Sequence, residues 1–240
     1  EKKILVQVEK MILDGADIID IGGFSSKPGA KTISLKEEEK RVIPIIKLIN
    51  KTFNKIIISV DTFRSEIAEK SLNEGASIIN DISGGDLDKN IYQISYKYKA
   101  PYIMMHMNGV PSNMQNNPKY ENINHDIIKD FTSKIDSAEK KGVCDIIIDP
   151  GFGFGKTIQH NYQILNNLKL YTVLKKPILV GISRKSMIYK LLKTDPSKAL
   201  NGTTSLNTIA LINGANILRV HDVKEAKEVI KLYSFLKENV

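Results

Sequence analysis

Short apolar runs alternate with longer amphipathic segments from one end of the chain to the other. The short runs are almost continuous Ile, Val, Leu and Met, which is typical of parallel strands whose two faces are both covered by helices. An in-and-out alternation of apolar and polar residues, typical of a sheet with one face in solvent, is not seen. The pattern therefore predicts seven buried parallel strands, at 16–21, 56–60, 77–82, 102–107, 146–148, 178–182 and 217–220.

The segments between these runs have apolar residues at helical spacing. They predict helices at 2–14, 34–53, 64–74, 90–99, 125–141 and 158–170, in parts of 186–213, and at 223–238. Helix–strand pairs of this kind build right-handed βαβ units, and 240 residues suit one α/β barrel of about 250 residues. Because the chain opens with a helix, we expect an α/β fold, a (β/α)8 TIM barrel without its first strand. A doubly wound open sheet is the alternative.

No change of composition marks a linker, so we expect residues 1–240 to form a single domain, with mobile segments at 22–33 and 108–122. The net charge of +8 comes from scattered Lys residues, which indicates a solvated basic surface. No basic patch interleaved with aromatic residues suggests nucleic acid as a partner. A single cysteine, Cys144, excludes an intramolecular disulfide, and we expect it to be small and buried. The cysteine count and the absence of a membrane-length apolar run suggest a cytoplasmic protein without a membrane partner.

Polar and glycine-rich residues follow every predicted strand. They occupy 20–29, 59–62, 80–85, 104–107, 149–156, 181–186 and 219–222. A lone Asp at a strand end is more often a helix N-cap than a catalyst. In a barrel, however, all these points meet at one face, and several carboxylates buried together are costly without ligands or counter-charges. The pattern favours one common site.

Two of these segments suggest an anion. Ser183–Ser186 places two cations beside two hydroxyls at a helix start. Arg219 and His221 are two residues apart, so in a strand their side chains point to the same side. The glycines of 149–156 do not have the spacing of a P-loop, and alone they are equally typical of a flexible rim loop. His106 and His221, taken singly, are also compatible with core histidines.

Six motifs, read in chain order, resemble those of dihydropteroate synthases, the pterin-binding enzyme family. They are ADIIDIGG, SVDTFRSEIAEKSLNEGASIINDISGG, MMHMNGVPSNMQ, IIIDPGFGFGKT, LVGISRKSMI and ILRVHDV. The resemblance covers essentially the whole chain. It implies a transferase of folate biosynthesis that joins 6-hydroxymethyl-7,8-dihydropterin pyrophosphate to p-aminobenzoate. It also implies a sulfonamide target, a homodimer and Mg²⁺ as cofactor.

The resemblance also implies roles for individual residues. The pterin site is matched by Asp61, Asn80, Asp149 and Lys185, and the pyrophosphate site by Arg219 and His221. Among these six, the residues expected to be catalytic are Asp61, Asp149, Lys185, Arg219 and His221. Further substrate-binding positions are Met105, Phe154 and Gly181 near the pterin, and Ser26, Lys27, Pro28, Arg184 and Ser186 around the aminobenzoate. The family's metal-ligand Asn would precede Glu1, so no metal ligand is expected in this chain.

The chain departs from the family in one visible motif. Phe24–Gly29 replaces the usual Glu-Ser-Thr-Arg-Pro-Gly, and Lys27 keeps the charge of the Arg but loses its bidentate fork. The same motifs are compatible with two alternatives. These are the pterin-binding domain of a methyltetrahydrofolate methyltransferase and a non-catalytic pterin-binding paralogue. The first has no pyrophosphate to hold, which makes Ser183–Ser186 and Arg219 hard to explain.

Overall fold

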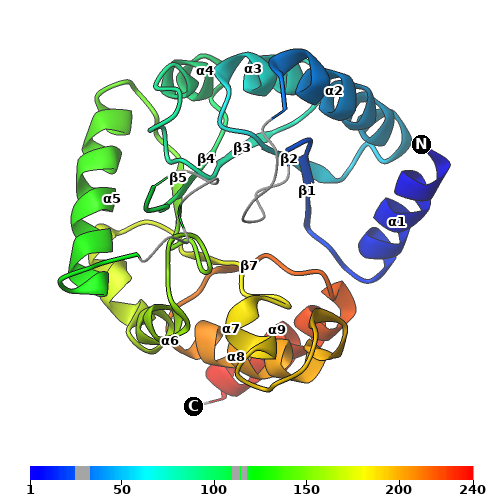
Figure 1. Ribbon diagram of the computed structural model, residues 1–240. Coiled ribbons are helices and arrows are strands. Elements are labelled where there is room, and N and C mark those ends of the chain that lie inside the picture. Colours follow the sequence, from blue (N-terminus) through cyan, green and yellow to red (C-terminus); the bar gives the residue numbers. More distant parts are fainter. Residues whose placement is uncertain (25–32, 110–113, 115–117, 240) are drawn as a thin grey trace.

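Seven parallel strands lie inside a ring of helices in the computed structural model, which describes residues 1–24, 33–109, 114 and 118–239 (Figure 1). The strands are β1 (Ile18–Gly22), β2 (Ile57–Asp61), β3 (Ile78–Asp81), β4 (Tyr102–Met105), β5 (Ile146–Asp149), β6 (Leu179–Val180) and β7 (Ile217–Leu218). All seven predicted strands are confirmed. The segments that we expect to be mobile fall partly outside the described residues.

The strands pair in the order in which they follow along the chain. β1 to β5 form one parallel sheet and β6 pairs with β7, while a single bridge between Ile148 and Ile178 joins the two groups. A doubly wound sheet would instead reverse its strand order near the middle. The consecutive order therefore excludes that alternative and is the order of a TIM barrel.

The helices match the predicted segments closely. They are α1 (Lys2–Leu13), α2 (Leu35–Thr52), α3 (Ser65–Asn73), α4 (Ile91–Tyr98), α5 (Ile123–Glu139), α6 (Ile158–Asn166), α7 (Ser186–Tyr189), α8 (Leu200–Ile212) and α9 (Val223–Glu238). Two short 3-10 helices, η1 (Leu168–Leu174) and η2 (Pro196–Lys198), interrupt the predicted helical segments 158–170 and 186–213. Pro196 has no N–H to donate to a preceding turn, so η2 begins a new helix there.

The two faces of each strand have different partners. Outward residues such as Ile19, Ile58 and Val60 pack with Val42 and Ile46 of α2. A larger outer cluster continues this layer around β3 to β7. Inward residues form a separate apolar layer across the barrel, made of Ile18, Ile78, Ile103, Ile147, Leu179 and Ile217. Both faces are therefore buried, as the continuous apolar runs indicate.

The last helix returns to the first strand. Lys227 of α9 pairs with Asp17, at 3.2 Å, just before β1. The same side chain packs over Gly15, where an added Cβ would meet the Lys227 Cγ at 3.2 Å. The ring of helices therefore brings α9 against the segment between α1 and β1.

The expectation for Cys144 is wrong. Its side chain is exposed, and its Sγ donates to the carbonyl oxygen of Gly142 at 3.4 Å. Cys144 lies in the turn between α5 and β5, where Val143 and Ile146 take the buried positions on either side. In the part of the chain that the structure describes, no helix is long and apolar enough to cross a membrane.

Candidate active site

A layer of polar side chains lies directly beyond the inner apolar layer, toward the C-terminal ends of the strands. Side chains two residues apart in a strand share a face, so each inward apolar residue predicts a second inward residue two positions later. In β1, β3, β4 and β5 the pairs are Ile18 and Asp20, Ile78 and Asn80, Ile103 and Met105, and Ile147 and Asp149. The same spacing, carried one residue beyond the ends of β6 and β7, gives Leu179 and Gly181, and Ile217 and Arg219. In β2 the corresponding inward residue is Asp61, which lies between Gly22 and Asn80 in the strand register.

Asp149 and Arg219 form an ion pair within this layer. The Arg219 Nη2 donates to the Asp149 Oδ2 at 2.7 Å, and the Gly151 N–H donates to the Oδ1 at 2.8 Å. Asp149 is fully buried. The Arg219 Nη1 is buried and has no hydrogen-bond partner within the protein. One end of this guanidinium is therefore committed to Asp149 and the other is left for a ligand.

Gly181 makes room for this arginine. A Cβ built on Gly181 would lie 3.0 Å from the Arg219 Nη2, closer than ordinary contact. The absence of a side chain at Gly181 therefore gives the Arg219 guanidinium the space to enter the site.

Asn80 and Asp20 form a second polar pair. The buried Asn80 donates from Nδ2 to the Asp20 Oδ2 at 2.9 Å, while the Asn80 Oδ1 is buried without a partner. Burial raises the pKa of Asp20, with a smaller rise from the Asp149 charge; Arg219 and the hydrogen bonds oppose this rise. Asp20 as a residue is exposed, although its carboxylate lies against the buried Asn80 amide.

Asp61 is the most perturbed carboxylate of the layer. Burial and then the Asp20 charge raise its pKa to about 8, against the effect of Arg219. The absence of a side chain at Gly22 leaves space beside it, because a Cβ there would lie 3.3 Å from the Asp61 Oδ2. Asp61 therefore keeps its proton to a higher pH than an ordinary carboxyl group.

Lys185 reaches the same region from the loop after β6. Its Nζ donates to the Phe152 carbonyl and lies 4.8 Å from the centre of the Phe154 ring. Burial and the neighbouring Arg219 charge lower the pKa of Lys185 to about 7, while Asp149 opposes the change. Its Nζ is therefore held against an aromatic face and near the Asp149 charge.

An apolar wall stands next to the polar layer. Ile82, Met105, Met107, Met114 and Phe154 form one buried cluster, against which Phe63 packs. Met105 is the register neighbour of Asp149. A few directed polar groups beside an apolar wall are the usual composition of a small-molecule site.

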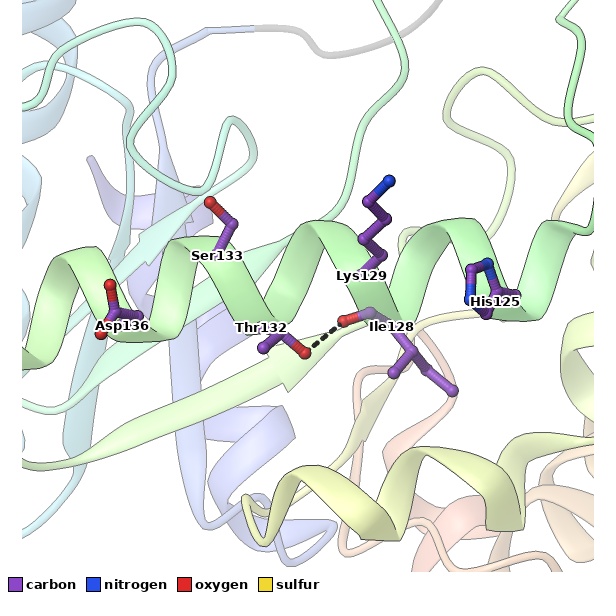
Figure 2. Close-up of a pocket in the computed structure, with 6 residues that line it drawn as sticks. All are labelled: His125, Ile128, Lys129, Thr132, Ser133 and Asp136. Carbon is purple, nitrogen blue, oxygen red and sulfur yellow. Dashed lines mark hydrogen bonds between the residues drawn. The ribbon is translucent and has the colours of Figure 1, made fainter.

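A shallow depression elsewhere on the surface has a different character. Figure 2 shows its residues, His125, Ile128, Lys129, Thr132, Ser133 and Asp136, all on the single helix α5. The hydroxyl of Thr132 donates to the Ile128 carbonyl of the same helix. Polar groups from several elements do not converge there, so the polar layer of the barrel is the candidate active site.

Comparison with known proteins decides the family. The model of the family described as pterin binding enzyme matches residues 1–221. The chain belongs to the pterin binding enzyme family.

Individual relatives of this family agree. The dihydropteroate synthase of Escherichia coli is 42% identical over 224 residues, covering 92% of this chain and 79% of that protein. The dihydropteroate synthase of Synechocystis is 42% identical over 229 residues, covering 94% of this chain and 79% of that protein.

Solved structures of relatives share the fold. The dihydropteroate synthase of Yersinia pestis in complex with a sulfonamide drug gives a TM-score of 0.94 at 37% identity, over 98% of this chain and 85% of that one. The Xanthomonas albilineans enzyme with 4-aminobenzoic acid gives 0.92 at 30% identity, over 98% of this chain and 85% of that one.

Within this pterin binding enzyme, four predicted residues meet as the strand ends suggest. Asp61, Asn80, Asp149 and Lys185 come from four different βα units, and all lie in or against the polar layer. Met105 and Phe154 supply the adjoining wall. Their individual roles toward a ligand stay predictions.

The side chains of the two residues predicted to bind an anion lie apart. Arg219 turns into the layer toward Asp149, whereas His221 is exposed at the rim, with its Nδ1 3.0 Å from the buried Ser183 hydroxyl. The reason is that β7 ends at Leu218, so the alternation of a strand no longer governs residue 221. His221 is thereby placed beside the loop that carries Lys185 rather than beside Asp149.

Arg184 is held by bonds within the protein. Its guanidinium makes two hydrogen bonds of 2.8 Å to Asp222 and donates to the carbonyls of Pro196 and Ser197. These bonds tie the loop after β6 to the segments around η2 and α9, so its position supports the loop instead of facing the polar layer. Ser186 begins α7 directly after Lys185. The predicted positions Ser26, Lys27 and Pro28 lie outside the described residues.

Two features escape prediction from motifs. Asp20 belongs to the polar layer, although the sequence marks it only as the first residue of the polar segment 20–29, without a role. Buried Lys156 lies with its Nζ 2.9 Å from the His106 Nδ1 and donates to the Phe154 carbonyl at 2.9 Å. Burial lowers the pKa of Lys156 to about 7 and that of His106 well below its usual value. This pair joins the loops after β4 and β5.

Proposed function

We propose that the chain acts as a dihydropteroate synthase. It condenses 6-hydroxymethyl-7,8-dihydropterin pyrophosphate with p-aminobenzoate and releases 7,8-dihydropteroate and pyrophosphate, a step of folate biosynthesis. The observation that carries the proposal is the pair of buried atoms without partners, Asn80 Oδ1 and Arg219 Nη1, in a layer that also holds Asp61, Asp149 and Lys185. The names of the relatives support the same activity.

The polar layer suits the pyrimidinone edge of a pterin. That edge presents N–H donors together with a carbonyl and ring-nitrogen acceptors. Asp61, Asp149 and the Asn80 Oδ1 accept, and Lys185 donates. The apolar wall with Met105 and Phe154 takes the faces of the ring. A planar heterocycle with donors on one edge fits this combination.

The reaction is a substitution at the pterin methylene carbon. The bond from carbon to the pyrophosphate oxygen breaks and its electron pair leaves with pyrophosphate. The amine nitrogen of p-aminobenzoate forms the new bond to carbon and then loses a proton. Positive charge that develops on the pterin is stabilised by Asp61 and Asp149, and the leaving anion by the free end of Arg219 and by His221.

Mg²⁺ does not find a ready-made cage in the chain. The described residues contain no group of three His, Cys, Asp or Glu side chains placed to hold a metal. Mg²⁺ is commonly held by one or two carboxylates together with substrate phosphates. We therefore propose that Mg²⁺ would enter with the pyrophosphate.

One assay tests the activity. Pyrophosphate release from the pterin pyrophosphate is measured with and without p-aminobenzoate, and then with a sulfonamide added. Release that requires the amine and is inhibited by the sulfonamide is expected. Pterin binding without release would identify a non-catalytic paralogue, and pterin-dependent methyl transfer would identify the methyltransferase alternative, which the relatives do not favour.

We also propose a cytoplasmic homodimer in which residues 1–240 act as one pterin-binding domain. Support for a partner copy comes from large apolar side chains exposed on two helices that pack together, α8 and α9. They are Ile209, Ile212, Leu232, Phe235 and Leu236. Exposed apolar side chains gathered on neighbouring elements are typical of protein interfaces.

A further inference from the structure

Asp20 has a relation to Asn80 that no motif assigns. The two side chains come from β1 and β3, with β2 between them, and meet at 2.9 Å across the barrel interior. Asn80 is 1% exposed. Its Nδ2 is satisfied by Asp20, and its Oδ1 has no partner. A buried polar atom without a partner costs free energy, so such an atom in a pocket signals a missing ligand.

The contact determines which way the amide faces. The oxygen and nitrogen of an Asn side chain exchange places when the amide turns over, so a lone Asn offers either a donor or an acceptor. An ionised carboxylate only accepts. It therefore selects the orientation in which Nδ2 faces Asp20 and Oδ1 faces the pocket.

We propose that Asp20 is a positioning residue, which holds the Asn80 amide so that Oδ1 accepts a hydrogen bond from an N–H of the pterin. This inference rests on the proposed pterin site, although its test measures binding rather than turnover. Burial raises the pKa of Asp20, while the charge of Arg219 and the Asn80 hydrogen bond favour the ionised carboxylate that the role requires.

The residue just before β1 offers a matched control. Asp17 lies three residues before Asp20, with a side chain 78% exposed, and pairs with Lys227 on the outside of the molecule. Substituting Asp17 removes one negative charge from the same segment without touching the polar layer. A difference between the two positions therefore reports on the Asn80 contact and not on net charge.

A double-mutant cycle tests the proposal. The fluorescence of 6-hydroxymethylpterin is titrated with the wild type, Asp20→Ala, Asn80→Ala, the double variant and Asp17→Ala. We expect Asp20→Ala to weaken binding roughly tenfold, as for a lost hydrogen bond to a charged group. Asp17→Ala should bind as the wild type does. In the Asn80→Ala background, Asp20→Ala should change the Kd less than about twofold, because the group that it positions is gone.

A second variant separates positioning from folding. Asp20→Asn keeps the shape of the side chain. If Asp20→Ala shows no cooperative unfolding, Asp20→Asn takes its place in the cycle. Because Asp20 raises the pKa of Asp61, we also expect the pH profile of pterin binding to shift to lower pH in Asp20→Asn. Disruption of the fold alone would not produce this shift.

Several outcomes overturn the inference. Unchanged binding by Asp20→Ala would do so, as would an equal loss in both backgrounds, since Asp20 would then act independently of Asn80. If the cycle gives the expected result but the wild type releases no pyrophosphate, the proposed function alone is overturned. If the wild type turns over its substrates but the losses of pterin affinity in the two single variants are additive, the inference alone is overturned. A wild type that binds no pterin overturns both.

Discussion

Three carboxylates and one guanidinium share the polar layer, and their balance decides what each does. Asp20, Asp61 and Asp149 all interact with Arg219, while the Asp149 charge raises the pKa of Asp20 and the Asp20 charge raises the pKa of Asp61. Like charges held together in a buried site lower stability unless a ligand or counter-ion compensates. The arrangement of the site therefore suits a bound ligand and lowers the stability of the ligand-free protein.

Asp61→Asn should stabilise the fold in a pH-dependent way. The pKa of Asp61 is about 8 in the folded protein against 3.8 as its ordinary value, so the folded state binds more protons between these values. The free energy of unfolding therefore falls as pH rises from about 4 to about 8, because Asp61 ionises less readily in the folded state than in the unfolded state. We expect Asp61→Asn to exceed the wild type by at least ~1 kcal/mol at pH 8.5, since one pKa unit corresponds to about 1.4 kcal/mol.

Thermal unfolding at several pH values measures this difference. The gain should shrink toward pH 4, where the wild-type carboxyl is protonated in both states. Asp17→Asn is the control, because its exposed side chain lies outside the layer. A gain that does not depend on pH would contradict the assignment to Asp61.

Arg219→Ala should weaken binding of the pterin pyrophosphate by roughly tenfold to a hundredfold, the loss expected for charged hydrogen bonds. The guanidinium also neutralises Asp149, so part of the loss belongs to the pterin. Binding of 6-hydroxymethylpterin, which has no phosphate, separates the two parts and should fall less. Arg41→Ala, on the exposed face of α2, is the control. Equal losses for both ligands would mean that Arg219 serves only Asp149.

Motifs locate the site at the level of residues but not all of its contacts. Asp61, Asn80, Asp149 and Lys185 can be predicted, because each follows a strand at the same end of a barrel. Asp20 resembles any acidic residue of an apolar strand until its partner from β3 is known. The contact of Arg184 with Asp222 is not predicted by a motif, because the two residues lie 38 positions apart in the chain.

The loop after β5 needs glycine at two positions, because the backbone there has a positive φ and lies close to the loop after β4. Gly151 has a φ of +69°, and a Cβ there would lie 1.9 Å from the His106 carbonyl oxygen. Gly155, with a φ of +61°, would place a Cβ 2.6 Å from the Asn108 carbonyl oxygen. The loop after β5 therefore packs backbone against backbone with the loop after β4, and the Lys156–His106 contact fastens the two.

Gly151→Ala should disrupt this packing. Gly214→Ala is the matched control, because Gly214 also has a positive φ, +103°, but the nearest atom to its Cβ would be at 3.6 Å. Backbone strain alone should cost Gly214→Ala ~1 kcal/mol. Gly151→Ala should lose an additional ~1–3 kcal/mol from overpacking and should also lose pterin affinity, since Asp149 accepts from the Gly151 N–H.

Urea unfolding and pterin titration of both variants check this prediction. Equal stability of the two variants would mean that the loop after β4 yields easily. Retained pterin affinity in Gly151→Ala would mean that the Gly151 N–H is not needed to orient Asp149.

Periodicity predicts the elements well because both strand faces and one helix face are buried. All seven strands and the helical segments follow from it. It does not predict the break into α7, η2 and α8, which depends on Pro196 and on the left-handed Lys193. The rim of the barrel is harder still, because polar loops carry no period and are placed by contacts such as Arg184 with Asp222.

The whole molecule separates stability from chemistry along the barrel axis. The apolar layer with Ile78 and Leu179 fills the interior below, and the polar layer with Asp149 and Arg219 opens above it. A TIM barrel commonly divides its ends in this way. The division explains why motif residues cluster at one end of every strand while the apolar runs themselves carry no functional signal.

Association is the property of the whole molecule that the surface suggests. Leu232, Phe235 and Leu236 are 73%, 69% and 59% exposed on α9, and Ile209 and Ile212 are exposed on α8, which packs against α9. Residues at i, i+3 and i+4 share one face of a helix, so these three form an apolar stripe. A stable interface buries about 800 Å² on each partner and has an apolar core. Two copies that join through α8 and α9 would cover the stripe.

Phe235→Glu should therefore convert a dimer into a monomer, because a carboxylate in the core of the interface would be buried without a partner. Sedimentation velocity over a range of concentrations measures the change. Leu13→Glu is the control: Leu13 is 81% exposed on α1, and its substitution should leave the dimer intact. Since Phe235 is remote from the polar layer, the monomer should still bind pterin. A Phe235→Glu protein that sediments as the wild type does would place the interface elsewhere, and a monomeric wild type would remove the homodimer from the proposal.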